Sequence, residues 1–187
     1  MSMKPLMLVI TGLPGAGKTT LSERLSREWC LPLISRDRIK EGYVHTMGMP
    51  GDQLPGSGNS ETNTAFFDVL SLLLDHGISC IAEAAFQHKL WSMYLPPFLK
   101  KADVRLLICR LDPHLALNRF LDRGMSDPDR LHFHGDKGVR MLQTGVKPDP
   151  GTWDEPHMGI PTFHINTTDG YDPPINEMKK LVFFGRQ

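Results

Sequence analysis

The sequence predicts an α/β fold, a three-layer α/β/α sandwich around a five-stranded parallel sheet, and three observations support this prediction. Short β-branched or leucine-rich runs recur along the chain, each about the length of a buried strand. Several are apolar almost throughout, which suits parallel strands covered on both faces, since half-exposed antiparallel strands would alternate with polar residues. Helical patterns separate these runs, so the order β-α-β-α-β-α-β-α-β is expected to wind into a doubly covered sheet.

The elements follow in order along the chain. Strands are expected at residues 5–11, 31–35, 78–84, 104–110 and 162–167. Leu21, Leu25 and Trp29 are spaced i, i+4, i+8, which predicts a helix after the first strand. The densely apolar stretch at residues 65–74 predicts another helix, which Gly77 would end as a C-terminal cap.

Two segments interrupt this pattern. Residues 47–59 are rich in Gly and Pro, and residues 123–159 are rich in Asp, Gly, Pro and His. Long irregular segments in a compact domain are usually functional loops or disordered. The chain is interpreted as one domain, residues 1–187, with a lid at about 123–159.

Composition narrows the class of protein. The chain has 187 residues, 40% of them apolar, which is enough to bury a core without disulfides or structural metals. Lys plus Arg (21) equals Asp plus Glu (21), so the net charge is zero. There is then no global field that would attract nucleic acid or an anionic membrane, which disfavours a nucleic-acid substrate without excluding it.

The cysteines and the N-terminus indicate a compartment. Cys30, Cys80 and Cys109 are odd in number and lack a C-x-x-C pair, and two of them lie in apolar runs. They are expected to be buried thiols in a reducing compartment. The apolar run at residues 7–10 is too short to span a bilayer and lacks the flanks of a secretory signal, so a cytoplasmic protein is expected.

The clearest motif is a phosphate-binding loop. Eight consecutive residues fit the P-loop (Walker A) pattern G-x-x-x-x-G-K-[ST]: Gly12, Leu13, Pro14, Gly15, Ala16, Gly17, Lys18 and Thr19. An apolar strand leads into the first glycine and a helix begins at Lys18 or Thr19, which argues against a plain glycine-rich turn. Backbone N–H groups would surround an anion at the positive end of the helix. We therefore expect ATP and Mg²⁺, with Lys18 on the β- and γ-phosphates, the Thr19 hydroxyl on the metal, and Thr20 beside the nucleotide.

A P-loop alone does not define a kinase, because GTPases and motor ATPases share it. GTPases usually carry N-K-x-D after a late strand, whereas here residues 166–169 read Asn-Thr-Thr-Asp, without the lysine. No hydrophobic strand ends in the Asp-Glu pair of large ATPase modules. The second strand ends in Ser-Arg-Asp-Arg at residues 35–38, which favours the small-molecule and nucleoside kinases.

With these motifs, nearly the whole chain resembles the AAA-33 or zeta-toxin-like group of P-loop kinases, which includes chloramphenicol phosphotransferase and the kinase domain of phage polynucleotide kinase. The resemblance implies that Asp37 contacts the acceptor hydroxyl as general base and that Arg38 orients the acceptor or its phosphate. The carboxyl end of the second strand lies near the phosphate loop in such folds, so a carboxylate there can reach that hydroxyl. The alternative is that Asp37 only caps a helix at residues 38–43. The expected strand order is 2-3-1-4-5.

The resemblance also implies roles for residues beyond the second strand. An acidic residue, usually Asp, would hold Mg²⁺ or the acceptor at the position of Glu83; the alternative is a satisfied polar strand end. Arg119 would lie over the adenine or contact the phosphates, and Arg123 would be a second such arginine, although spaced arginines are often a solvated helix face. Arg130 is a weaker third candidate.

Two further clusters have weaker interpretations. His132, His134 and Asp136 could ligate a metal, but three ligands in an irregular loop are a poor zinc signal, and a polar lid is the favoured interpretation. Residues 166–169 lie where this fold places loops around adenine, on topology alone.

The predicted function is ATP-dependent transfer of the γ-phosphoryl group to a hydroxyl of a small molecule. The acceptor would enter between Asp37, residues 47–59, the helix at 65–74 and Glu83. Its predicted lining carries few fixed charges, which would suit a neutral or weakly charged molecule: Tyr43, His45, Phe66, Phe67, Phe86 and His88. Two alternatives stay open, a polynucleotide 5′-hydroxyl kinase and a nucleotide-binding ATPase switch without an acceptor, and the oligomeric state is open as well.

Overall fold

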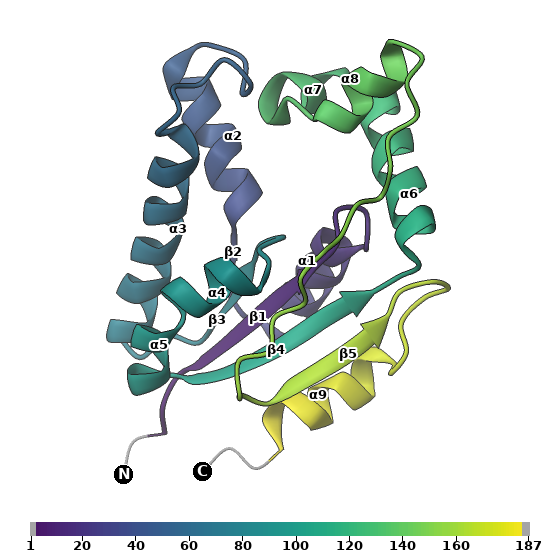
Figure 1. Cartoon of the computed structure of the whole chain (residues 1–187). Helices are drawn as coiled ribbons and strands as arrows, with labels where there is room; N and C mark the ends of the chain where they lie inside the picture. Colours follow the sequence, from purple (N-terminus) through teal and green to yellow (C-terminus); the bar gives the residue numbers. More distant parts are fainter. Residues whose placement is uncertain (1–2, 185–187) are drawn as a thin grey trace.

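The computed structural model describes residues 3–184, and its centre is a five-stranded parallel sheet (Figure 1). The strands are β1 (Leu6–Gly12), β2 (Leu33–Ser35), β3 (Cys80–Glu83), β4 (Asp103–Arg110) and β5 (Thr162–Asn166). Their order in the sheet is β2-β3-β1-β4-β5, and every pairing is parallel. The predicted fold class and strand order are confirmed.

One or more helices follow each strand along the chain. They are α1 (Lys18–Trp29), α2 (Arg36–Met47), α3 (Gly58–Asp75), α4 (His88–Tyr94), α5 (Pro96–Lys101), α6 (Pro113–Ser126), α7 (Pro128–His134), α8 (Lys137–Gln143) and α9 (Ile175–Phe183). Gly77 follows α3 with a positive φ of 73°, and Ile78 N–H donates to the Leu73 carbonyl across it, as the predicted C-terminal cap requires.

The sheet is covered on both faces, because alternate residues of each strand point to opposite sides. Met7 and Val9 of β1 face the core shared with α3, α4 and α5. Leu6, Leu8 and Ile10 face the second core, which α1 and α9 complete. Figure 1 shows these two helical layers with the sheet between them. The carboxyl ends of the strands are thereby left free for a site.

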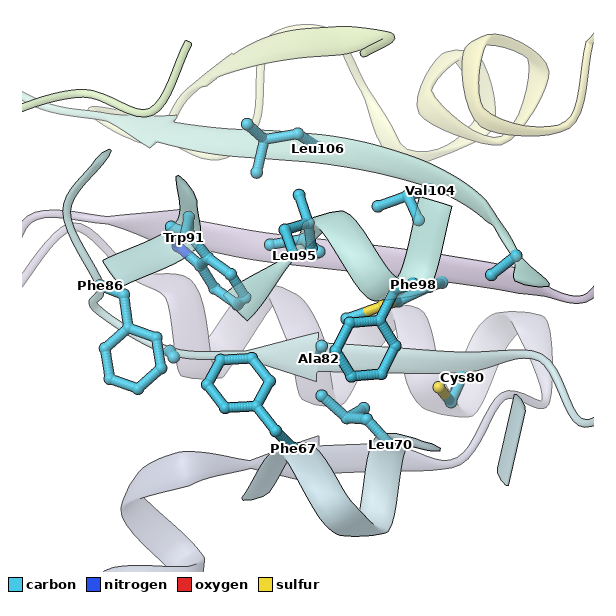
Figure 2. Packing of buried hydrophobic residues seen from close by; sticks show 14 of the residues in the cluster. Phe67, Leu70, Cys80, Ala82, Phe86, Trp91, Leu95, Phe98, Val104 and Leu106 are labelled. Atoms are coloured by element: carbon cyan, nitrogen blue, oxygen red, sulfur yellow. The ribbon is translucent and has the colours of Figure 1, made fainter. Parts of the chain in front are cut away.

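The first core is built around aromatic rings. Figure 2 shows Phe67 of α3 near Phe86 and Trp91, and the ring centroids of Phe86 and Trp91 are 5.3 Å apart. Trp91 Nε1 donates to Thr11 Oγ1 at 3.3 Å, and that hydroxyl donates to the Phe86 carbonyl at 3.0 Å. These bonds fix the end of β1, where the phosphate loop begins, against the α4 side of the core.

The two segments predicted to be irregular are partly helical. α2 continues to Met47 and α3 begins at Gly58, so only residues 48–57 form a loop between them. The predicted lid contains the end of α6 and the two short helices α7 and α8, which we call the lid helices. Asp127 caps α7 by accepting the N–H groups of Asp129 and Arg130. The prediction of irregular structure was therefore wrong for the helical parts of these segments. Side-chain caps and tertiary packing can stabilise helices that are too short to show an apolar period in the sequence.

A buried arginine ties the C-terminal helix to the sheet. Arg105 of β4 is 7% exposed and donates to the carbonyls of Leu181 and Phe184 at 3.2 and 3.0 Å. It also pairs with Asp103 at 3.1 Å. The guanidinium therefore satisfies carbonyls at the end of α9 that the helix itself leaves without donors.

The cysteines match the prediction in part. Cys80 and Cys109 are buried, and burial raises the pKa of each thiol to about 12. Cys30 is exposed, contrary to the prediction, because it ends α1 in the left-handed conformation with φ of 54° and faces solvent. Among residues 3–184, no helix is both long enough and apolar enough to cross a membrane.

Candidate active site

The phosphate loop turns sharply between β1 and α1. Gly12 and Gly15 have φ values of 148° and 84°, which side-chain-bearing residues rarely adopt. A Cβ atom on Gly15 would lie 2.0 Å from the Ala116 carbonyl oxygen, so only glycine lets the loop pack against α6. Lys18 is buried and donates from Nζ to the Leu13 carbonyl at 2.8 Å. Burial lowers the pKa of Lys18, while Glu83 opposes that shift.

A cavity of about 670 Å³ opens at the carboxyl ends of β1, β2 and β3. Its walls are the phosphate loop, the first turns of α2, one side of α6 and the lid helix α7. The cavity brings together all the residues predicted to be catalytic or to bind metal: Lys18, Thr19, Asp37, Arg38, Glu83, Arg119 and Arg123. Of the predicted nucleotide-binding residues, Pro14, Gly15, Gly17 and Thr20 also line it, whereas Gly12, Leu13 and Ala16 are not among its lining residues.

Glu83 ends β3 at the floor of the cavity. It is paired in register with Ile10 of β1 and with Ser35 of β2, and it is 2% exposed. Ser35 Oγ donates to Glu83 Oε2 at 2.6 Å. Burial raises the pKa of Glu83, and the Ser35 hydrogen bond and the positive charge of Lys18 oppose that rise.

Asp37 lies in the first turn of α2. The helix begins at Arg36 with Ser35 at its N-cap, so the alternative that Asp37 caps a helix at residues 38–43 is wrong. Its side chain is 51% exposed and faces the cavity. Desolvation raises the pKa of Asp37, but His134, Arg36 and Lys18 outweigh it, and the net shift is downward. The carboxylate is therefore ionised at neutral pH and can accept a proton.

Three arginines predicted from the sequence hold different positions. Arg119 donates to the carbonyls of Thr167 and Thr168 at 3.0 and 2.8 Å, which fastens α6 to the loop after β5. Arg123 lies one turn further along α6 at the cavity wall, where desolvation and the nearby Arg130 lower its pKa. Arg38 is mostly exposed and pairs with Glu23 at 3.3 Å, at the outer edge of the cavity.

The lid helix α7 contacts α2, and Figure 1 shows the two helices facing each other. Residues of both helices line the cavity. His134 Nε2 is hydrogen bonded to Glu41 Oε1 at 3.0 Å, and Lys40 Nζ donates to the His134 carbonyl at 3.3 Å. Arg130 pairs with Asp136 at 2.9 Å. His134 and Asp136 thus have partners of their own, and residues 3–184 contain no cluster of three or more His, Cys, Asp or Glu suited to a metal ion.

The predicted acceptor lining is wrong. Phe66, Phe67 and Phe86 point into the core, where Figure 2 shows the last two. The His45 ring packs on Phe133, and the His88 ring stacks on His157 at 3.7 Å. None of the six residues predicted as lining, Tyr43 included, is among those that line the cavity. The apolar residues of α3 pack against the sheet and do not reach the cavity. The wall beside Asp37 is therefore formed by charged residues of α2 and α7.

Two of these charged residues were not predicted as site residues. Arg36 and Lys40 both line the cavity on either side of Asp37 along α2. Arg36 donates to Asn63 Oδ1 at 3.0 Å and to Asn59 Oδ1 at 2.9 Å. The signal that could have identified them is their i, i+4 spacing in the segment that also carries Asp37, which puts both on one face of a helix.

The oxygen donors around the phosphate loop fit Mg²⁺. Thr19 offers a hydroxyl, and Glu83 and Asp37 offer carboxylates, all at the wall of one cavity. Mg²⁺ prefers oxygen and is usually held by one or two protein groups, with phosphate oxygens and water completing its shell.

Comparison with known proteins places the chain in a family. The family model described as an AAA domain, AAA-33, matches residues 7–144. A "putative kinase" from Chloroflexus aurantiacus j-10-fl has a TM-score of 0.76 and 21% identity over 95% of both chains. A sugar kinase from Janibacter sp. HTCC2649 has a TM-score of 0.62 and 14% identity, covering 97% of this chain and 96% of that one.

A third solved structure is the Mycobacterium tuberculosis APS kinase CysC in complex with AMPPNP and APS. Its TM-score is 0.59 at 16% identity, covering 96% of this chain and 98% of that one. Comparison with curated proteins gave no match. Because the family model covers most of the chain and the solved kinases share its fold from end to end, the chain belongs to the AAA-33 family of P-loop proteins.

Proposed function

We propose that the protein is an ATP-dependent P-loop kinase that transfers the γ-phosphoryl group to a hydroxyl of a small molecule. One observation carries this proposal: the phosphate loop with Lys18 and an ionised carboxylate at Asp37 line the same cavity and interact electrostatically. A γ-phosphate bound by the loop and an acceptor hydroxyl beside Asp37 would therefore share this cavity.

The residues supply the parts that phosphoryl transfer needs. The loop N–H groups and Lys18 bind the β- and γ-phosphates, and Arg119 and Arg123 approach from α6 to neutralise charge on the transferring group. Asp37 orients the acceptor hydroxyl and accepts its proton as the oxygen–phosphorus bond forms and the bond to the β-phosphate oxygen breaks. Bound Mg²⁺, held by Thr19 with Glu83 nearby, would neutralise the β- and γ-phosphate oxygens.

The docked lid helix supports transfer over hydrolysis. α7 lies across the cavity and contacts α2 through His134, Glu41 and Lys40. Further closure of α7 over bound substrates would exclude water, which would otherwise take the phosphoryl group in place of the acceptor. The fold neighbours include kinases with small-molecule acceptors, among them the APS kinase structure and a gluconokinase from Sinorhizobium meliloti 1021, whose TM-score is 0.51.

The proposal is tested by nucleotide binding and by transfer. ATP–Mg²⁺ is expected to raise the Tm of the wild type and to leave that of Lys18→Ala almost unchanged, because the variant lacks the cation that binds the phosphates. Radiolabelled γ-phosphate should pass to a hydroxyl compound in a panel of sugars, polyols, nucleosides and hydroxy acids. Asp37→Asn should bind ATP normally and lose transfer by about 100-fold or more.

Two outcomes contradict the proposal. ATP hydrolysis that no acceptor in the panel changes, and that Asp37→Asn leaves intact, would indicate an ATPase switch. Transfer to the 5′-hydroxyl of an oligonucleotide, with affinity falling steeply as salt rises, would indicate a polynucleotide kinase.

A further inference from the structure

Two cations of α2 have no part in the mechanism above. Arg36 and Lys40 are four residues apart, on the face of the helix that lines the cavity. Asp37, the proposed base, lies in the same turn of α2 as Arg36. Like charges at this spacing destabilise a helix when nothing neutralises them. The groups around Arg36 and Lys40 must therefore show what offsets the repulsion between the two positive charges.

Arg36 is held in place by neutral groups. Its side chain is 13% exposed, and it donates to the amide oxygens of Asn59 and Asn63 and to Thr62 Oγ1 at 2.9, 3.0 and 3.3 Å. These acceptors fix the guanidinium without cancelling its charge. Arg36 also forms an ion pair with the Asp37 carboxylate at 3.6 Å, which is longer than a direct hydrogen bond. The guanidinium is thus preorganised at the cavity wall with its charge only partly compensated.

The positive charge of Lys40 is also only partly compensated. It is 8% exposed, and Nζ donates to the His134 carbonyl at 3.3 Å. Three carboxylates face it: Asp37, Asp52 and Asp136. Asp52 is bound to Arg140 and Asp136 to Arg130, so these two already have partners. Burial lowers the pKa of Lys40, and repulsion from Arg36 lowers it further. Burying an ammonium group whose neighbouring carboxylates already pair with other cations costs free energy, and a bound anion would reduce that cost.

We propose that Arg36 and Lys40 form a subsite for an anionic group on the acceptor, a carboxylate or a phosphate or sulfate ester, and thereby place its hydroxyl at Asp37. This inference rests on the proposed kinase function. A fixed guanidinium matches the two oxygens of such a group, and an ammonium adds a point charge. Arg130 adds positive charge to the same wall, and Glu41 is hydrogen bonded to His134. The subsite replaces the neutral acceptor that the sequence suggested.

The first test measures anion binding apart from catalysis. With AMPPNP–Mg²⁺ filling the phosphate loop, sodium sulfate is titrated at constant ionic strength and the Tm is recorded. The wild type is expected to show a saturable rise in Tm. Arg36→Gln and Lys40→Met should each weaken sulfate at least tenfold. Arg24→Gln and Lys101→Met serve as matched controls, since those cations lie outside the cavity in pairs with Glu28 and Asp75, and they should bind sulfate as the wild type does.

The second test uses acceptors that differ by one anionic group, glycerate against glycerol and glucose 6-phosphate against glucose. The wild type should phosphorylate the anionic member of a pair more efficiently, and Arg36→Gln should lose that preference through KM. Arg36→Lys, which keeps a charge, should retain part of it. AMPPNP affinity reports folding in each variant, because the P-loop is formed by other residues.

The outcomes separate the two proposals. If AMPPNP–Mg²⁺ fails to stabilise the wild type, the kinase proposal fails and the subsite with it. If AMPPNP binds but sulfate shows no saturation, or if Arg36→Gln and Lys40→Met bind sulfate as the controls do, the subsite is refuted and the kinase proposal stands. In that case Arg36 serves only to fasten α2 to α3.

Discussion

Ser35 Oγ donates a 2.6 Å hydrogen bond to the buried carboxylate of Glu83, across the register that pairs β2 with β3. The hydroxyl holds the carboxylate toward the phosphate loop and favours its charged form, which burial disfavours. Since the pKa of Glu83 is raised in the folded state, the folded protein binds this proton more tightly than the unfolded chain does. The contribution of Glu83 to stability therefore falls as pH rises from the unfolded pKa through the folded one.

Glu83→Gln is expected to separate the stability role of this residue from its metal role. The neutral amide removes the cost of burying a charge but also the attraction to buried Lys18, so the two effects oppose each other and the free protein should have about the wild-type stability at pH 7. The fall in stability with rising pH should be smaller. The affinity for Mg²⁺ in the presence of ATP should drop about tenfold or more, because a carboxylate ligand is lost. Urea unfolding across pH 4 to 8 and titration with Mg²⁺ measure the two effects. Mg²⁺ affinity equal to that of the wild type would show that Glu83 is only a polar strand end.

Gly15→Ala is expected to disrupt the phosphate loop. Its φ is 84°, and the new Cβ atom would collide with the Ala116 carbonyl. Backbone strain of this kind costs about 1 to 3 kcal/mol, and relief of the collision would move the loop away from α6. ATP affinity should fall at least tenfold, as measured by calorimetric titration.

Gly170→Ala is the matched control for that substitution. Gly170 also has a positive φ, 78°, but nothing lies within 4 Å of its would-be Cβ. Only the conformational cost of about 1 kcal/mol applies there, and ATP binding should be unchanged. Equal loss of ATP affinity in both variants would show that general destabilisation, and not loop geometry, is measured.

The sheet and the phosphate loop were predictable because their signals are local. Apolar runs located the five strands to within two residues at each end, and the P-loop pattern includes its own helix start. The acceptor wall was not predictable in this way. An apolar residue such as Phe67 can face a core or a ligand, and sequence periodicity alone does not distinguish the two.

The role of Arg36 could not be predicted from the sequence either. Its position next to Asp37 was visible, but its fixed guanidinium depends on Asn59 and Asn63, which lie 23 and 27 residues further along the chain. The lid helices, of seven residues each, were missed because α7 is stabilised by the Asp127 cap and by contacts with α2, and α8 by contacts with α6. Both features come from tertiary contacts, which a reading of neighbouring residues does not include.

Arg105→Met is expected to lower the stability of the whole chain without altering the site. The substitution leaves the carbonyls of Leu181 and Phe184 without this donor, and a hydrogen bond to a charged group contributes about 1.5 to 3 kcal/mol. Urea unfolding should show a loss of that size, while ATP affinity stays within twofold. Arg24→Met, which breaks an exposed i, i+4 pair with Glu28, should cost much less, because exposed ion pairs are screened by solvent. A similar loss in both variants would argue against a structural role for the buried guanidinium.

Gly51→Ala is expected to impair docking of the lid. Gly51 N–H donates to the His132 carbonyl at 2.7 Å, and a Cβ atom on Gly51 would lie 2.0 Å from the Phe133 carbonyl oxygen. α7 would have to move away from the loop between α2 and α3, which opens the cavity to water. The ratio of ATP hydrolysis to phosphoryl transfer should therefore rise several-fold, with ATP affinity little changed. Gly56→Ala, in the same loop with nothing within 4 Å of its would-be Cβ, should keep the wild-type ratio. If Gly51→Ala also kept that ratio, contact between this loop and α7 would not be what excludes water, and protection of the phosphoryl group would have to come from the acceptor itself.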